Sequence, residues 1–206
     1  MNLQRPVFYF LVTTGTFACV MGIAALLFAA QSVRAQTTDS APQIVMAPDD
    51  LRAELKDVLP QTRLIGKSRL TVWGFEVYDA RLWAQPGFKA DNLSSQPFAL
   101  ELAYLRDFAN TDVAERSIKE MRRSAAISET QAKAWIAEML RVIPDVKKGD
   151  RIMGVHRPGG VAQFLVNGKP SGEIRDAEFA RLFFGIWLSP KTSEPKLRSA
   201  LLAGAV

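Results

Sequence analysis

The chain has 206 residues with 26 basic and 21 acidic side chains, a formal net charge of +5. No acidic residue occurs in the first 35 positions, so the remaining 171 residues carry 24 basic against 21 acidic side chains, a net charge of +3. That balance excludes the strongly basic surface of a nucleic-acid-binding protein, and 171 residues suit one domain with one core.

An export signal is predicted at residues 1–35. A basic N-terminus precedes an apolar run over 17–30, and small side chains at 33 and 35 form a cleavage-site pattern. The alternatives are an uncleaved anchor at 6–30, which is long enough to span a bilayer, or a lipid-modified Cys19. Cleavage would place the mature protein in the periplasm of a bacterium with two membranes, and an uncleaved segment would hold it at the inner membrane.

The next segment, 36–48, is polar and without periodicity, which is typical of a linker leading into a domain at 49–206. A short helix is predicted from 49 to 59. Between 63 and 83 the chain is rich in β-branched and aromatic residues on both sides of Trp73-Gly74. We expect a β-hairpin with its turn at this pair, or a loop one residue longer, because Trp rarely adopts a positive φ.

Residues 97–106 alternate between apolar and other side chains, which predicts a strand that covers one side of a core. Two helices are expected to follow, at about 111–127 and 129–142. Ser128 with Gln131 three residues later matches the capping pattern at the start of the second.

Three short strands are predicted at 151–156, at 161–166 and from Asn167-Gly168 to about residue 174, because Asn-Gly is the strongest sequence signal for a tight hairpin. Asp176 should cap an apolar helix, and a shorter helix is expected over 193–202. Strands joined without a crossover connection, followed by helices, predict an α+β fold with a mostly antiparallel sheet.

The residue content excludes several kinds of chemistry. Residues 36–206 contain no Cys and one His, which rules out a thiol nucleophile and a Cys/His metal site there. No phosphate-binding loop or nucleophile elbow is present, so no cofactor is predicted. His156 lies beside a Pro-Gly-Gly turn and is expected to be a solvated residue at a hairpin end.

Charged and aromatic groups allow structural and functional interpretations. Asp107, Asp112 and Glu115 are explained by their positions at a helix start, although carboxylates can also act as acids or bases. A basic stripe predicts the solvated face of an amphipathic helix, or a weak contact with anionic lipid headgroups. Its members are Arg116, Lys119, Arg122 and Arg123. Two aromatic groups are expected in the core, namely Phe179, Phe183, Phe184 and Trp187, and the pair Trp73 and Trp83.

One cross-strand pair suggests a binding site. If Trp73-Gly74 is a two-residue turn with regular pairing, Arg69 lies opposite Tyr78 on the same face of the sheet. A guanidinium and a phenol can together hold a carboxylate. The alternative is an exposed Arg whose stem packs over a ring.

A group of motifs spread over about 51–202 resembles the exported bacterial branch of the chalcone isomerase-like family. The motifs are Gly66-x-x-Arg69, Phe75-x-Val77-Tyr78-Asp79-Ala80-x-Leu82-Trp83, Leu100-x-Leu102-x-Tyr104-x-Arg106-Asp107, Lys148-Gly149-Asp150, Asn167-Gly168-x-x-x-Gly172-x-Ile174-x-Asp176-x-x-Phe179 and Phe184-x-Ile186-Trp187-Leu188.

The resemblance implies an open-faced β-sandwich, with helices layered on an antiparallel sheet and a ligand cleft between them. In the plant enzymes of this family an Arg positions a flavonoid while a Tyr and an Asn assist ring closure. Arg69 matches the Arg, but Val113 and Glu120 stand near the places of the Tyr and Asn, which argues against chalcone cyclisation. Non-catalytic plant relatives resemble fatty-acid binders that hold the carboxylate with an Arg and a Tyr.

The resulting ligand-binding hypothesis comprises Arg69 as the anion anchor with Tyr78, and Trp83 or Tyr104 as rival aromatic neighbours. The leading functional hypothesis is non-catalytic binding of a small amphipathic ligand, fatty-acid-like or phenolic. The alternatives are an isomerase or intramolecular lyase acting on an enone-like substrate, and an accessory protein at a membrane surface. The sequence does not indicate an oligomeric state.

Overall fold

The computed structural model describes residues 52–206, so the predicted export signal at 1–35 and linker at 36–48 lie outside the described residues. Within the described part, no helix is both long and apolar enough to cross a bilayer. The elements in chain order are α1 (Leu55–Val58), β1 (Arg63–Val72), β2 (Phe75–Ala84), the 3-10 helix η2 (Leu93–Ser95), β3 (Phe98–Tyr104), α2 (Asn110–Met121), α3 (Glu129–Val142), β4 (Arg151–Arg157), β5 (Val161–Val166), β6 (Lys169–Arg175), α4 (Ala177–Leu188) and α5 (Pro195–Leu201).

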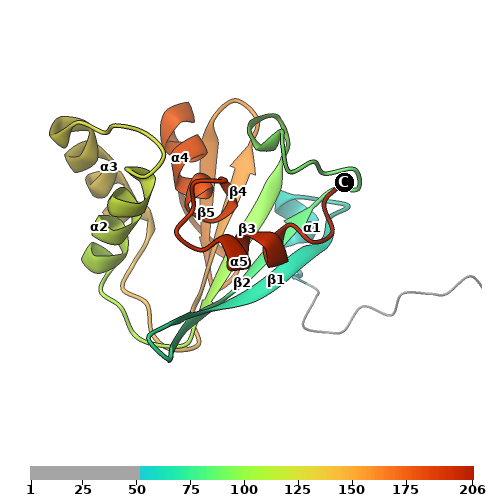
Figure 1. Cartoon of the computed structure of the whole chain (residues 1–206), viewed down its shortest axis with the longest axis horizontal. Helices are drawn as coiled ribbons and strands as arrows, with labels where there is room; N and C mark the ends of the chain where they lie inside the picture. The colour runs from blue at the N-terminus through green and yellow to red at the C-terminus, as the bar shows by residue number, and fades with distance from the viewer. Residues whose placement is uncertain (1–51) are drawn as a thin grey trace, which may run out of the picture. The chain divides into compact units, whose positions relative to one another are not determined.

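The described strands form one six-stranded sheet in which each strand pairs antiparallel with its neighbour in the chain, in the order β1-β2-β3-β4-β5-β6 (Figure 1). Helices α2 and α3 are inserted between β3 and β4. The loop at 85–97, which carries η2, joins β2 to β3, and the remaining neighbouring strands are joined by turns of two or three residues. Antiparallel neighbours need no crossover connection. This arrangement confirms the predicted α+β class and the antiparallel sheet.

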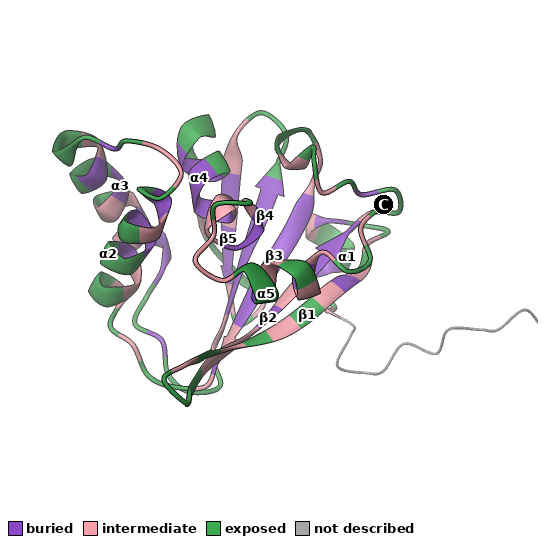
Figure 2. Ribbon diagram, in the orientation of Figure 1, coloured by how far each residue is buried: buried purple, intermediate pink, exposed green. Residues whose placement is uncertain are grey.

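The two faces of the sheet are covered differently. One face packs against α2, α3, α4 and α5 in a large apolar core, which we call the helix-covered face. The other face packs against α1 through a smaller apolar cluster, and we call it the α1-covered face. Strand β3 contributes side chains to both faces. Leu100 and Leu102 point into the large core, while Ala99 and Glu101 point to the α1-covered face. Buried residues therefore line the middle of the sheet (Figure 2).

The β1–β2 hairpin has the predicted two-residue turn. Trp73 and Gly74 both have positive φ, at 50° and 82°, which is the backbone of a type I′ turn. The alternative of a longer loop is therefore wrong. The prediction that Trp73 belongs to the core is also wrong, because its side chain is 95% exposed, whereas Trp83 is buried.

The predicted pairing of Arg69 with Tyr78 is wrong. A register shift between Leu70 and Thr71 moves the pairing by one residue, so Leu70 lies opposite Tyr78 and Arg69 lies opposite Asp79. Because side chains alternate along a strand, one bulged residue places Arg69 and Tyr78 on opposite faces of the sheet.

The helices largely follow the predictions. Helix α3 begins where Ser128 accepts a hydrogen bond from the Gln131 N–H at 3.2 Å, and α4 begins where Asp176 accepts one from Phe179 at 2.9 Å. Helix α2 is shorter than predicted and ends at Met121, whose side chain is fully buried. Residues 122–128 turn back toward α3 without a Pro or Gly to signal the stop. Helix α1, Leu55–Val58, is also shorter than the helix predicted at 49–59, of which residues 49–51 lie outside the described residues.

The C-terminal helix covers the outer strand. A Cβ at Gly66 in β1 would lie 2.1 Å from the carbonyl oxygen of Ala200, so only glycine allows α5 to approach this closely. Gly204 N–H then donates to the Ile65 carbonyl at 2.9 Å. These contacts protect part of the β1 edge, which would otherwise present unpaired backbone groups.

Candidate functional site

The predicted anion anchor, Arg69, is committed to its own hairpin. Its Nε donates to Asp79 Oδ1 at 2.6 Å, Nη2 donates to Asp79 Oδ2 at 3.0 Å, and Nη1 pairs with Glu76. The side chain is 45% exposed and points away from the helix-covered face. The hydrogen bond from Arg69 is the largest cause that lowers the pKa of Asp79. Arg69 is thus balanced by two carboxylates of the hairpin itself.

Tyr78 and Tyr104 lie together on the helix-covered face. Their strands place them opposite each other, with ring centroids 6.1 Å apart and edge to face. Tyr78 Oη accepts a hydrogen bond from Trp187 Nε1 at 2.9 Å. Burial raises the pKa of Tyr78 to about 12 and also raises that of Tyr104, so both phenols are neutral at pH 7. The pair joins β2 and β3 to α4.

Trp83, the fourth predicted residue, lies on the α1-covered face. It packs with Leu55 and Leu59, and the guanidinium carbon of Arg52 is 5.5 Å from its ring centroid. The structure therefore brings Tyr78 and Tyr104 together but separates both from Arg69 and Trp83. The four residues do not surround a shared site.

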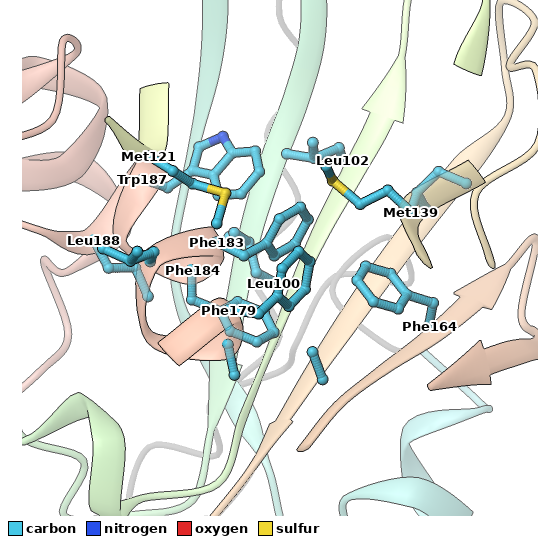
Figure 3. Packing of buried hydrophobic residues seen from close by; sticks show 14 of the residues in the cluster. Leu100, Leu102, Met121, Met139, Phe164, Phe179, Phe183, Phe184, Trp187 and Leu188 are labelled. Atoms are coloured by element: carbon cyan, nitrogen blue, oxygen red, sulfur yellow. The ribbon is translucent and has the colours of Figure 1, made fainter. Parts of the chain in front are cut away.

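Arg69 lines neither of the two hollows described below. Between the sheet and the helices, apolar side chains from both layers interdigitate, as Figure 3 shows for Leu100, Phe164, Phe179 and Phe183. Phe179 and Phe183 stack with centroids 5.3 Å apart, and Phe183 meets Phe164 edge to face at 5.4 Å. The part of the core next to these rings is filled by side chains.

A groove of about 660 Å³ lies at one border of this core. Its walls are α4, the chain that joins α4 to α5, and the loop that carries η2. We call it the α4 groove. Its apolar floor consists of Leu93, Phe98, Leu182, Phe184 and Leu188, and its charged rim consists of Asp91, Arg181, Lys191 and Arg198. The volume is within the range of small-molecule sites.

His156 lies in the floor of the α4 groove. It sits opposite Phe98 in the β3–β4 ladder, and the two rings stack with centroids 4.8 Å apart. Its Nδ1 is 3.0 Å from the Gln96 carbonyl oxygen, so Nδ1–H donates there and the neutral ring leaves Nε2 as an acceptor. Burial lowers the pKa of His156 and favours this neutral form. The prediction that His156 is solvated is therefore wrong, because the residue is only 3% exposed.

The rim of the α4 groove is positively charged. Within residues 52–206, none of Arg181, Lys191 and Arg198 forms an ion pair with a carboxylate. Arg198 is oriented by its Nε, which donates to the Leu188 carbonyl at 2.8 Å. Asp91 is the single carboxylate among the described lining residues. Three cations against one acid, beside an apolar floor, favour an anion with an apolar body.

The sequence interpretation missed this site. The signal was present in α4, where Arg181 is the one basic residue of a helix that is apolar apart from Glu178 in its first turn. Lys191 and Arg198 follow the end of the helix by three and ten residues, and nothing in this spacing shows that the chain folds back over the same end of the sheet. His156 and Phe98 are far apart in sequence and meet only through strand pairing.

Three members of the basic stripe, Arg116, Arg122 and Arg123, are paired with carboxylates. Arg116 pairs with Glu120 at 2.7 Å, and Arg122 pairs with Glu129 at 2.6 Å. A smaller hollow of about 420 Å³ lies between α2 and α3, and its lining mixes both charges. The interpretation as a solvated helix face is confirmed by the exposure of the stripe. No cluster of metal-ligating side chains occurs in the described part of the chain.

Comparison with known proteins finds a matching family, a bacterial relative and a similar solved structure. A profile of the family described as chalcone isomerase-like matches residues 63–203. An uncharacterized protein of Haemophilus influenzae is 29% identical over 139 residues, which cover 67% of this chain and 66% of that protein, just under two thirds of its length. A solved fatty-acid binding protein of Arabidopsis thaliana matches with a TM-score of 0.55 and 12% identity, covering 77% of this chain and 95% of that one. At this identity the structural likeness shows the fold alone.

Proposed function

The chain belongs to the chalcone isomerase-like family, and from this premise we propose that it binds a small amphipathic carboxylate, fatty-acid-like or phenolic, in the α4 groove without turnover. The observation that carries the proposal is the pairing of an apolar floor with three rim cations that have no carboxylate partner in the described chain. A carboxylate can pair with the rim while its tail covers Phe98 and Phe184.

Several features support binding rather than catalysis. The groove floor is built from hydrocarbon side chains, and His156 is its one imidazole. The nearest carboxylate in the lining, Asp91, has no hydrogen bond to His156, so the described groove offers no oriented acid–base pair. The related fold of a fatty-acid binding protein supports the ligand class.

Titration calorimetry with dodecanoate and with dodecanol tests the site. These ligands share an apolar chain and differ in charge. Substituting both Arg181→Gln and Lys191→Gln should weaken dodecanoate binding about tenfold, since each exposed cation contributes about 0.2–1 kcal/mol. Dodecanol binding should be unchanged. Lys169→Gln removes an exposed cation at the start of β6 and serves as the matched control.

A second variant tests the apolar floor. Gly185 lines the groove, and a Cβ there would make an ordinary contact of 3.6 Å with Ser189. Gly185→Leu should therefore fold and should abolish binding of both ligands by filling the groove. Equal affinity of dodecanoate in the wild-type protein and in both groove variants would refute the site. A change in the mass or the chromatographic retention of the ligand after incubation would show turnover in place of binding.

We also propose that residues 1–35 export the domain to the periplasm. The basic start, apolar run and small residues before position 36 support this. Mass spectrometry of the protein recovered from a periplasmic extract should show a chain beginning at Gln36. A full-length chain in the membrane fraction would instead establish the uncleaved anchor.

A further inference from the structure

Two hairpins of the sheet share one turn geometry but differ in the residue that makes it. The first turn residue has φ of 50° both at Trp73 and at Asn167, and a glycine follows each. Asn is common at this position because it tolerates positive φ, whereas a bulky residue is strained there. Asn167 also bonds within the fold, since its Oδ1 accepts from Arg151 N–H at 2.8 Å and its Nδ2 donates to Asp150 at 2.9 Å.

Trp73 brings no comparable benefit to the folded chain. Its side chain is 95% exposed, and Phe75 beside it is 60% exposed. These are the two large aromatic residues that the described chain exposes most. A strained backbone that presents an indole to solvent points to a role outside the fold.

The hairpin tip lies past the last backbone pairing with β3. The β2–β3 ladder ends at the pair Tyr78 and Tyr104, and one more hydrogen bond joins the Leu105 N–H to the Val77 carbonyl at 2.9 Å. Residues 72–75 lie beyond these contacts. In Figures 1 and 2 the turn between β1 and β2 forms the exposed lower end of the sheet.

Basic groups accompany the aromatic tip. The guanidinium carbon of Arg106 is 5.0 Å from the centroid of the Phe75 ring. The acidic neighbours Glu76 and Asp107 are bound by Arg69 and Lys147. Arg106 itself has no carboxylate partner among the described residues, so its charge is available beside the exposed rings.

We propose that the hairpin tip formed by Trp73, Phe75 and Arg106 docks into the interface of an anionic lipid bilayer. Trp is favoured at the boundary between headgroups and acyl chains, and Arg pairs with lipid phosphate. Two rings on a narrow turn are too small for a stable protein interface, which buries about 800 Å² per partner. A narrow tip is suited to insertion, because the rest of the sheet stays in water.

Fluorescence of the full-length chain tests the proposal. All four Trp residues lie within the described part, and the other three are 7% exposed or less. Residues 1–51 contain no Trp, so lipid contact by that segment adds no signal. Vesicles of phosphatidylethanolamine and phosphatidylglycerol should reduce acrylamide quenching of Trp73 at least threefold. Brominated acyl chains in the same vesicles should quench it.

Trp73→Asn supplies the reference spectrum, because it installs the residue that makes the equivalent turn at Asn167 and so preserves the fold. Subtracting it from the wild-type spectrum isolates Trp73. Phe75→Ser and Arg106→Gln should each restore acrylamide quenching of Trp73. The matched control, Lys119→Gln with Arg122→Gln on the basic stripe of α2, should leave the protection intact.

The proposal is overturned if vesicles leave the acrylamide quenching of Trp73 unchanged, or if the α2 control abolishes the protection as fully as Phe75→Ser does. Protection of Trp73 that rises with protein concentration in the absence of vesicles would identify a second copy of this chain as the occupant and would equally refute it. Failure of this test does not affect the α4 groove, whose ligands are titrated without vesicles.

Discussion

Each face of the sheet buries an ionisable side chain, His156 on the helix-covered face and Glu101 on the α1-covered face. The two side chains differ in the groups that surround them. His156 is neutral and bonds to one backbone carbonyl. Glu101 is surrounded by three guanidinium groups. It accepts from Arg52 at 2.8 and 2.9 Å and from Arg151 at 2.6 Å, and Arg81 lies at 3.5 Å.

The difference follows from what covers each face. Four helices cover the first with hydrocarbon and aromatic side chains, which leave little compensation for a charge, so the imidazole loses its proton. The four-residue α1 covers less of the second face, and long Arg side chains complete the cover. The guanidinium groups of Arg52, Arg81 and Arg151 pair with the buried Glu101 carboxylate. The apolar face is thus the one suited to binding an amphipathic ligand.

Among substitutions that test this difference between the two faces, the largest loss of stability is expected at Glu101. Glu101→Gln should lower the free energy of unfolding by about 3–5 kcal/mol, because it removes the buried carboxylate that three partly buried guanidinium groups share. Urea denaturation measures the change. The ligand affinity of the α4 groove should be unaffected in the folded fraction, since the groove lies on the other face. A loss below about 1 kcal/mol would show that the cluster is not the main stabiliser of its face.

A smaller effect is expected at Tyr78, which tests whether a predicted ligand residue is structural. Tyr78→Phe leaves the Trp187 N–H without its acceptor and should cost about 1–3 kcal/mol of stability. Dodecanoate affinity should stay within twofold of wild type in calorimetry. A tenfold loss of affinity with unchanged stability would return Tyr78 to the binding site.

The dependence of stability on pH should separate the two faces further. Because the folded pKa of His156 is lowered, its contribution is complete above about pH 6.5 and is lost as the pH falls below the unfolded value. The slope for one proton is at most about 1.4 kcal/mol per pH unit. Urea denaturation measures the free energy of unfolding of the wild type and of His156→Gln between pH 7 and 5. The difference between the two proteins should change with pH, at no more than this slope. Parallel curves for the two proteins would contradict the prediction.

The smallest effect is expected at Arg69. Arg69→Gln breaks ion pairs that are open to solvent and screened by it, so neither the unfolding midpoint nor dodecanoate affinity should change measurably. The Lys169→Gln protein provides the scale for a neutral surface substitution. Loss of ligand binding in Arg69→Gln would restore the original anchor and remove the α4 groove.

Local patterns predicted the fold well because they report burial directly. The alternation of β3 identified the residues that meet the large core, and Ser128 and Asp176 marked the starts of α3 and α4. Asn167-Gly168 marked a turn. Each of these signals depends on a few neighbouring residues, so it survives without knowledge of the rest of the chain.

The candidate site was harder to predict because it depends on register and on distant segments. One bulged residue in β2, Val77, has no partner between the pairs Leu70–Tyr78 and Thr71–Glu76 and so places Arg69 and Tyr78 on opposite faces. No composition signal marks a bulge of this kind. His156 was predicted to be solvated because its neighbours are turn residues. The loop around η2, some sixty residues earlier in the chain, covers it and supplies the Gln96 carbonyl.

The sequence by itself determined the α+β class, the antiparallel strands, the helix starts and the family resemblance, since all are carried by local periodicity and ordered motifs. Only the tertiary structure decided which face each charged side chain occupies and which segments enclose a hollow. The physical reason is that strand register and loop packing minimise the free energy of the whole core, so a single bulge can move a side chain from the apolar face to water.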